Sequence, residues 1–186
     1  MSSPGPTDER VRYERLYRDH YAEILSYAAR RIDIDTARDV AAETFVAAWR
    51  RLDQIPTHAA RAWLFTTARR MLSNEYRSSE RRERLVAKIQ HTRPVDLALV
   101  PDLADAIVGR EQAIALLAGL STSDREVLEL TEWDGLTSAE GAHVVGCSTA
   151  TFRVRLHRAR RRLLALYKTQ QTPHASDVVL AARSQP

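Results

Sequence analysis

The chain has 186 residues, of which 44% are hydrophobic and 28% are charged, with only 6 glycines and a formal net charge of +4. This composition excludes fibrous and disordered chains and favours a soluble, helix-rich protein of one or two small domains. The single cysteine, Cys147, excludes an internal disulfide, and no apolar run approaches the ~20 residues of a membrane span. We therefore expect a cytoplasmic protein that does not insert into a membrane.

Three helices are predicted in the first half of the chain, over about residues 8–31, 36–52 and 59–84. In the second helix, one face is apolar and is expected to pack inward. The opposite face carries Asp39, Glu43, Val46 and Arg50. The third helix begins with apolar residues, including Trp63 and Phe65, which are more typical of a core than of a contact surface. It ends in an arginine-dense stretch.

Helical periodicity weakens over residues 85–106, where two prolines occur and the charge turns acidic. Such a segment is typical of a flexible linker. It divides the chain into a first module, residues 10–84, and a second module, residues 107–168. Residues 1–9 are expected to be a disordered N-terminus, and residues 169–186 a flexible tail.

The second module is predicted to open with helices over about residues 107–118 and 123–132. Ser123 and Glu126 have the spacing of a capping box and are expected to start the second of these helices. Asp134-Gly135 then predicts a turn.

A helix-turn-helix is predicted from Ser138 to about Tyr167. Thr137 and Glu140 form a capping box for its first helix, Gly146 can end that helix with a positive φ, and Ser148 can cap the next helix. Gly141 lies where such a motif usually has a branched apolar residue. We expect this glycine to cost up to about 1 kcal/mol in helix propensity and to leave a thinner core.

The last helix is rich in arginine, and no acidic residue occurs between Ser148 and Lys168. In a helix that is merely exposed to solvent, Glu usually alternates with Arg because opposite charges four residues apart stabilise the helix. The absence of Glu therefore favours DNA binding through the major groove.

Both modules resemble the extracytoplasmic-function group of bacterial sigma factors. DVAAETFVAAWRRL resembles sigma region 2.2, RAWLFTTARRMLSNEYRSSERR resembles regions 2.3 and 2.4, and LTSAEGAHVVGCSTATFRVRLHRARRRL resembles region 4.2. The resemblance implies an all-α fold of two small helical domains, sigma region 2 and sigma region 4 with its helix-turn-helix, joined by a flexible linker. It also implies a subunit that binds core RNA polymerase and directs promoter-specific initiation at minus-10 and minus-35 elements.

The resemblance assigns three sets of contact residues. The minus-35 set is Ser148, Thr149, Thr151, Arg153, Val154, Arg155, His157 and Arg158. The minus-10 set is Arg69, Arg70, Asn74 and Arg77, and the set for core polymerase is Asp39, Glu43 and Phe45. Ala42 and Arg70 stand where the family often has Gln and Asn. The implied partners are the clamp of the largest polymerase subunit, the flap of the second-largest subunit, promoter DNA and an anti-sigma factor, with no cofactor and no metal.

Two other classes of protein agree less well with the sequence. A two-domain helix-turn-helix regulator that is not a polymerase subunit would have a similar second module. A receiver domain as its first module would need alternating strands and helices, which residues 10–84 do not predict. An enzyme is disfavoured because the sequence has no phosphate loop, nucleophile elbow or paired metal-ligand motif, and its six histidines are scattered.

Overall fold

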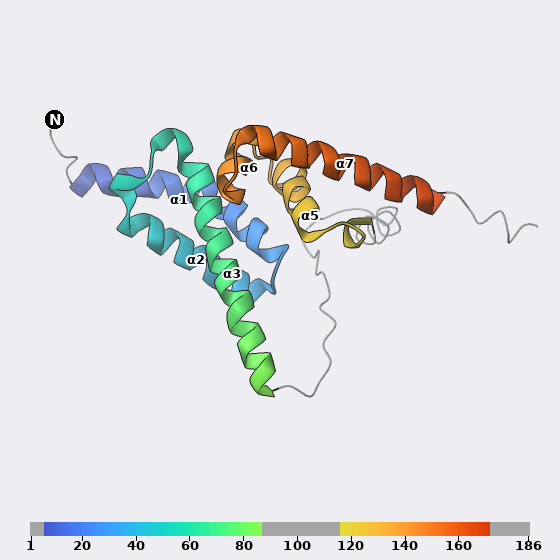
Figure 1. Cartoon of the computed structure of the whole chain (residues 1–186). Helices are drawn as coiled ribbons and strands as arrows, with labels where there is room; N and C mark the ends of the chain where they lie inside the picture. The colour runs from blue at the N-terminus through green and yellow to red at the C-terminus, as the bar shows by residue number, and fades with distance from the viewer. Residues whose placement is uncertain (1–5, 87–115, 172–186) are drawn as a thin grey trace, which may run out of the picture.

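The computed structural model describes residues 6–86 and 116–171, and within these ranges every regular element is a helix (Figure 1). The predicted all-α fold is confirmed. The first module consists of α1 (Pro6–Ala29), α2 (Ile34–Arg50), the short 3-10 helices η1 (Leu52–Gln54) and η2 (Thr57–Ala59), and α3 (Ala60–Val86). The second module consists of α5 (Thr122–Leu128), the π-helical turn η3 (Glu129–Trp133), α6 (Ser138–Val145) and α7 (Thr149–Gln171).

The ends of the helices differ from the predicted boundaries. Helix α1 begins at Pro6, so residues 6–9 are helical although a disordered segment was predicted there. Proline suits the first position of a helix, and Asp8 and Glu9 interact favourably with the helix dipole in the first turn. Helix α7 likewise continues to Gln171, past the predicted start of the tail. The predicted linker beyond Val86, most of the predicted helix over 107–118 and the tail after Gln171 lie outside the described residues.

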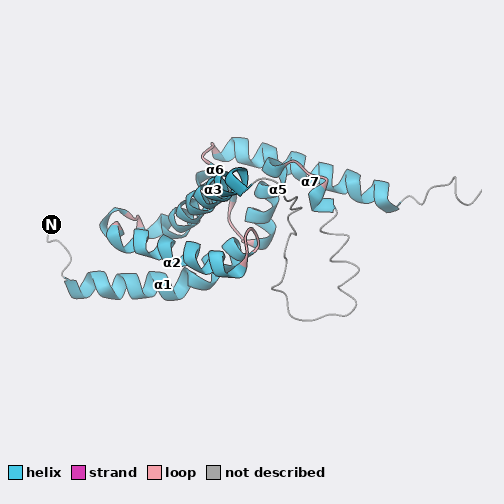
Figure 2. Cartoon of the chain, turned by 90° about the horizontal axis from the view of Figure 1, so that it is seen from below, coloured by secondary structure: helices cyan, strands magenta, loops and turns pink. Residues whose placement is uncertain are grey.

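Helices α1 and α2 run side by side in opposite directions, and α3 crosses them (Figures 1 and 2). Asp33 caps α2, since its Oδ1 accepts a hydrogen bond from the Thr36 amide at 3.0 Å. The inward face of α2 is the apolar face predicted from the sequence: Ala37, Val40, Ala41, Thr44, Phe45 and Ala48 are all buried. This packing leaves the opposite face of α2 exposed to solvent.

Helix α5 is capped two residues before the predicted position. Its cap is Ser121, whose Oγ accepts a hydrogen bond from the Asp124 amide at 3.2 Å. The predicted capping box of Ser123 and Glu126 was therefore wrong. The Glu126 side chain instead pairs with Arg69 of α3.

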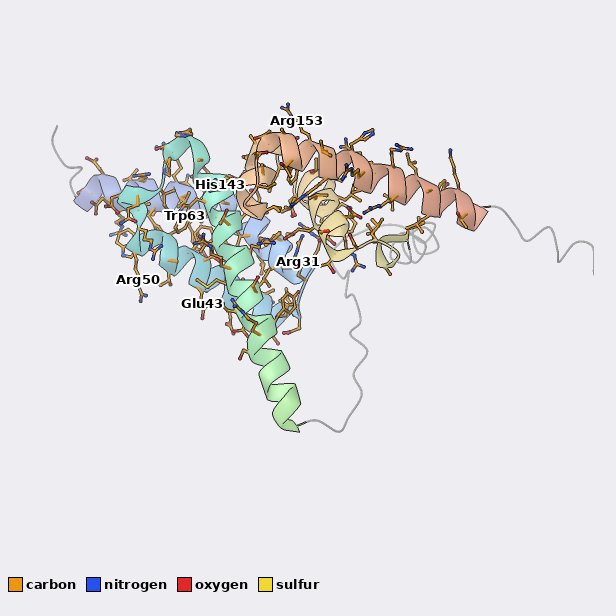
Figure 3. The ribbon with its side chains drawn as sticks, viewed as in Figure 1. Arg31, Glu43, Arg50, Trp63, His143 and Arg153 are labelled. Atoms are coloured by element: carbon orange, nitrogen blue, oxygen red, sulfur yellow. The ribbon has the colours of Figure 1, made fainter. Side chains whose placement is uncertain are left out.

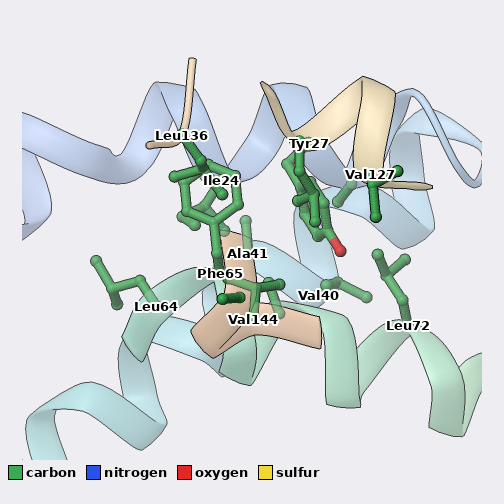
Figure 4. Close-up of a cluster of buried hydrophobic side chains, with 14 of the residues drawn as sticks. Ile24, Tyr27, Val40, Ala41, Leu64, Phe65, Leu72, Val127, Leu136 and Val144 are labelled. Carbon is green, nitrogen blue, oxygen red and sulfur yellow. The ribbon is translucent and has the colours of Figure 1, made fainter. Parts of the chain in front are cut away.

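The two modules share one hydrophobic core. Tyr27 of α1 and Phe65 of α3 are fully buried and lie in the same cluster as Val127, Leu136 and Val144 of the second module (Figure 4). Helix α6 packs against α3 across this boundary. The second module therefore docks on the first. Among residues 6–86 and 116–171, no helix has both the length and the apolar character to cross a membrane.

Candidate nucleic-acid interface

The helix-turn-helix is fixed by local hydrogen bonds at each of its ends. At the start of α6, the Glu140 amide donates to Thr137 Oγ1 at 3.2 Å, and the Thr137 amide donates to Glu140 Oε2 at 2.8 Å. Gly146 ends α6 with φ of 77°, a conformation that side chains disfavour. At the start of α7, the Thr151 amide donates to Ser148 Oγ at 3.1 Å. The predicted capping box, left-handed glycine and serine cap are all confirmed.

Gly141 is the position where α6 and α7 approach most closely. A Cβ atom at this position would lie 2.4 Å from Cζ of the Phe152 ring and 2.8 Å from Cε2. Both residues are buried, so the aromatic ring of α7 fills the space that a side chain of α6 would otherwise occupy. The expectation of a thinner core at Gly141 was wrong because Phe152 supplies the missing volume.

Helix α7 separates an inward apolar face from an outward polar face. Phe152, Leu156 and Ala159 are buried against α5 and α6. The outward face of the first three turns carries Arg153, Val154, His157 and Arg158, all exposed. Figure 3 shows the Arg153 side chain pointing away from the rest of the molecule.

The remaining residues of the predicted minus-35 set lie around the start of α7. Ser148, Thr151 and Arg155 are exposed, and Thr149 is half-buried. The whole set is thus gathered on the first three turns of α7 and the preceding cap. Exposed guanidinium and imidazole groups in this arrangement can donate hydrogen bonds to base edges and phosphate oxygens.

Other arginines of α7 bind carboxylates within the second module. Arg160 donates from Nε and Nη2 to Glu132 Oε1, at 3.0 and 2.6 Å. Arg162 binds the Asp124 carboxylate. In the described part of the chain, no ion pair involves Arg153, Arg155 or Arg158, so these three guanidinium groups are available to an external anion.

The predicted minus-10 residues of α3 divide into two groups. Arg70, Asn74 and Arg77 are exposed and follow one another along a single stripe of the helix, and Arg77 Nη2 donates to Asn74 Oδ1 at 2.7 Å. Arg69 lies on a different face and turns toward the second module. Its Nε and Nη2 donate to the two oxygens of Glu126 at 2.6 and 3.0 Å, and these hydrogen bonds hold the pKa of Arg69 above its ordinary value.

The predicted polymerase-binding residues of α2 also fall into two groups, one exposed and one buried. Asp39 and Glu43 are exposed, and Glu43 points away from the module in Figure 3. Phe45 is only 1% exposed and packs against Tyr17 and Tyr21 of α1. Its ring therefore supports the outer surface and does not form part of it.

The outward face of α2 also has apolar side chains that the predicted set omitted. Val46 is 48% exposed and Trp49 is 49% exposed, and the Trp49 ring contacts Tyr13 edge-on at 5.0 Å. Their spacing from Ala42 and Glu43, three to seven residues, places them on the same side of the helix. An exposed patch that combines carboxylates with a large aromatic ring is typical of a protein-binding surface.

Two family models match this sequence, one for each module. The model of Sigma-70 region 2 matches residues 16–82. The model of Sigma-70, region 4, matches residues 110–163. The two matched ranges correspond to the two modules of the structure.

Proteins of known identity match across both modules. The ECF RNA polymerase sigma factor SigL of Mycobacterium tuberculosis is 36% identical over 151 residues, which cover 80% of this chain and 84% of that protein. The RNA polymerase sigma factor YlaC of Bacillus subtilis is 32% identical over 153 residues, which cover 81% of this chain and 88% of that protein.

Solved structures of similar fold include two complexes. CnrH in complex with the cytosolic domain of CnrY superposes with a TM-score of 0.57 at 29% identity, covering 84% of this chain and 88% of that chain. The sigma factor RpoE in complex with the anti-sigma factor NepR, from Bartonella quintana, superposes with a TM-score of 0.52 at 26% identity, covering 87% of this chain and 95% of that chain.

Proposed function

The chain belongs to the extracytoplasmic-function group of sigma-70 RNA polymerase sigma factors, and from this membership we propose that it acts as a non-catalytic initiation subunit with three contact surfaces. Helix α2 binds core polymerase, α3 contacts the minus-10 element, and α7 contacts the minus-35 element. Each surface is exposed in the structure, and the three are carried by different helices.

The observation that carries this proposal is the division of arginines on α7. Arg160 and Arg162 are held by carboxylates of the same module, whereas Arg153 and Arg158 on the outward face have no ion pair among the described residues. A helix whose exposed side carries guanidinium groups free of internal ion pairs is suited to bind base edges and phosphate oxygens in the major groove.

On α3, the exposed stripe of Arg70, Asn74 and Arg77 supports contacts with the minus-10 element. An amide and two guanidinium groups can bind both the edge of an unstacked base and the phosphates of a single strand. Arg70 replaces the Asn that the family often has, which adds a cation and removes an amide acceptor at that position.

On α2, Asp39 and Glu43 supply charge, and Val46 and Trp49 supply apolar area, for docking on the clamp of the largest polymerase subunit. The second module would bind the flap of the second-largest subunit. The two structural relatives were solved in complex with the cytosolic domain of CnrY and with the anti-sigma factor NepR. We propose that this chain likewise has an anti-sigma partner.

Run-off transcription with purified core polymerase tests this function. The chain is expected to produce promoter-dependent transcripts only when core enzyme is present, because each module alone makes few DNA contacts and the polymerase fixes both in place. Tight footprints from the free chain, with no transcript from the complex, would instead identify a helix-turn-helix regulator that works without being a polymerase subunit.

Substitutions on α7 test the minus-35 surface. Arg153→Ala and Arg158→Ala are each expected to weaken binding of the holoenzyme to promoter DNA by about 1–3 kcal/mol, the magnitude of a bidentate base contact. Arg160→Ala is the matched control, because that side chain lies on the same helix but is paired with Glu132. Minus-35 protection that is equally strong in all three variants would remove Arg153 and Arg158 from the interface.

A further inference from the structure

One residue on the outward face of α7 differs in chemistry from those around it. Val154 is apolar, yet it is 50% exposed. Its neighbours on that face are Arg153, His157 and Arg158. Guanidinium and imidazole groups can hydrogen bond to base edges and phosphate oxygens, whereas a valine side chain can bond to neither. The proposed minus-35 surface therefore contains an apolar position that hydrogen bonding to DNA does not explain.

Val154 lies at the centre of the outward face. Phe152 and Leu156, two residues before it and two residues after it, are both buried. Because successive residues of an α-helix are rotated by about 100°, each of these two buried residues lies about 160° from Val154 around the helix axis. Val154 is therefore on the side of α7 directly opposite the core. In a helix seated in the major groove, this is the position that comes nearest to the base edges.

Ala150 extends the apolar position by one turn toward the start of α7. It is exposed and lies four residues before Val154, so the two side chains are neighbours on the same side of the helix. We refer to Ala150 and Val154 as the apolar strip. Arg153 and Arg155 flank the strip, since each is rotated by about 100° from Val154, one in each direction. The strip is thus a narrow apolar line with cationic side chains on both sides.

The start of α7 holds the apolar strip in a fixed place. Ser148 caps the helix, and the hydroxyl groups of Ser148 and Thr151 also hydrogen bond to each other at 2.8 Å. Ala150 lies within this capped turn. Alanine has no side-chain rotamers to lose, and valine in a helix is largely confined to one χ1 rotamer. The strip therefore loses little conformational entropy when it contacts a ligand, in contrast to the long arginine side chains beside it.

The folded state of the second module gives no reason for valine at position 154. The side chain lies opposite the buried face of α7 and adds nothing to the core. A β-branched residue is also a weaker helix former than the alanine, leucine and arginine that make up much of α7. The strip is therefore explained by a ligand of the outward face and not by the stability of the helix.

The major groove of DNA offers one apolar group that matches the strip. Thymine presents its C5-methyl group there, whereas the other bases present hydrogen-bond donors and acceptors. Small apolar side chains, including alanine, can pack against this methyl group. The guanidinium groups beside the strip are suited instead to O6 and N7 of guanine. The outward face of α7 thus has two parts that favour different bases.

We propose that Ala150 and Val154 select thymine in the minus-35 element by packing against its C5-methyl group. This inference rests on the proposed function, because it requires α7 to lie in the major groove. It adds Ala150 to the contact residues and gives Val154 a role in specificity. The contact buries apolar surface without binding a phosphate, so it contributes to the choice of base and not to the salt dependence of binding.

Replacing thymine with deoxyuridine tests the methyl contact, because it removes the methyl group and leaves the hydrogen-bonding groups of the base unchanged. Holoenzyme is assembled from the full chain and purified core polymerase. Its affinity is measured for a labelled promoter that it transcribes, with thymine or deoxyuridine throughout the minus-35 region of both strands. Deoxyuridine should weaken binding by about three- to fivefold for each methyl group that the strip contacts. The slope of log affinity against log salt should stay the same, because no phosphate contact is lost.

Val154→Ser is the variant that assigns this loss to the strip. It should bind the thymine promoter about three- to fivefold more weakly than the original chain and should distinguish thymine from deoxyuridine less than the original chain does. Ala150→Ser should weaken the preference for thymine in the same direction. Leu164→Ala is the matched control, because Leu164 is also an apolar residue of α7, is 58% exposed, and lies outside the proposed contact residues. This control should keep both the affinity and the preference of the original chain.

Three results would overturn the proposal. One is equal affinity of the original holoenzyme for the two promoters, and another is a preference for thymine that Val154→Ser retains in full. The third is a lower affinity of the Val154→Ser chain for core polymerase itself, which would assign the strip to a protein contact. Transcribed promoters that have no thymine in the minus-35 region on either strand would also contradict it.

Arg153→Ala, measured on the same two promoters, separates this inference from the proposed function. If Arg153→Ala weakens binding and deoxyuridine does not, α7 contacts the minus-35 element but the strip does not select thymine. If neither change weakens binding, the minus-35 surface itself is wrong, and the inference fails with it.

Discussion

The Phe152 ring of α7 lies against the backbone of α6 at Gly141, where a Cβ atom would come within 2.4 Å of the ring. The Phe152 ring is fully buried, so it cannot turn into solvent to make room for a side chain at Gly141. Glycine is weak in a helix for entropic reasons, but here it allows the largest side chain of the helix-turn-helix core to fit. One residue therefore sets the distance between the two helices.

Gly141→Ala is accordingly expected to destabilise the protein, although alanine favours a helix by up to about 1 kcal/mol over glycine. Overpacking of a rigid core costs about 1–3 kcal/mol, so the net loss should reach up to about 2 kcal/mol in urea unfolding followed by circular dichroism. In a Phe152→Leu background the same substitution should cost less, because the smaller side chain can move. Equal costs in the two backgrounds would show that the ring is not the obstacle.

At the scale of elements, α5 and η3 carry two carboxylates with opposite pKa shifts. Burial alone would raise the pKa of Asp124, but hydrogen bonds from Arg162 and Ser121 outweigh it and lower the pKa below its ordinary value of 3.8. Burial raises the pKa of Glu129 above 4.5 despite the nearby Arg31, Arg125 and Arg30. Relative to the unfolded chain, folding therefore favours the charged form of Asp124 and the neutral form of Glu129.

These directions predict opposite pH dependences of the free energy of unfolding. The stabilisation from Asp124 is present above pH 3.8 and is lost as pH falls through its lowered pKa, so Asp124→Asn should be destabilising at pH 7 and nearly neutral in acid. The stabilisation from Glu129 is greatest below pH 4.5 and is lost as pH rises through its raised pKa. Glu129→Gln should therefore lower the free energy of unfolding only slightly at neutral pH. Urea titrations at a series of pH values between acid and neutral measure this free energy for both variants. A larger loss of unfolding free energy for Glu129→Gln than for Asp124→Asn at neutral pH would contradict these directions of the pKa shifts.

The sequence predicted the elements whose signals are local. The inward face of α2, the capping box at Thr137, the left-handed Gly146 and the cap at Ser148 all follow from residues within one or two turns. Ser121 and Ser123 both have an acidic residue three positions later, so spacing alone could not decide which of them caps α5. In the structure Ser121 is the cap, and the Glu126 side chain pairs with Arg69 of α3.

For residues of the candidate site, the sequence predicts exposure only where that exposure depends on the residue's own helix. Arg69 and Arg70 are neighbours in sequence, yet one faces the second module and the other faces solvent. That difference depends on contacts between residues 57 positions apart, for which helical periodicity carries no signal. Phe45 is similar, since it belongs to the family pattern but is buried under two tyrosines of α1.

At the scale of the whole molecule, the two modules share a core instead of meeting only through charges. Leu136 of the second module is 2% exposed and lies beside Ile24 and Phe65 of the first (Figure 4). Leu136→Ala is expected to cost about 2–5 kcal/mol, the usual range for a large-to-small change in a core. Both modules should lose stability, because the cavity left by the substitution would lie between them.

Tryptophan fluorescence can follow this effect, since Trp49 and Trp63 report on the first module and Trp133 on the second. Single-tryptophan versions of the chain should show both modules unfolding at lower urea in the Leu136→Ala variant. A shift confined to the Trp133 signal would mean that the first module does not depend on its neighbour for stability.

The π-helical turn at Glu129–Trp133 is equivalent to an α-helix with one residue inserted. Removing a single residue there, such as Thr131, would restore regular α-helix and rotate the rest of the second module by about 100° relative to α5. Asp134 would then leave Arg30, and the helix-turn-helix would point in a new direction from the first module. The direction of the helix-turn-helix relative to α5 thus depends on the presence of one residue in η3, which lies outside the proposed minus-10 and minus-35 contact residues.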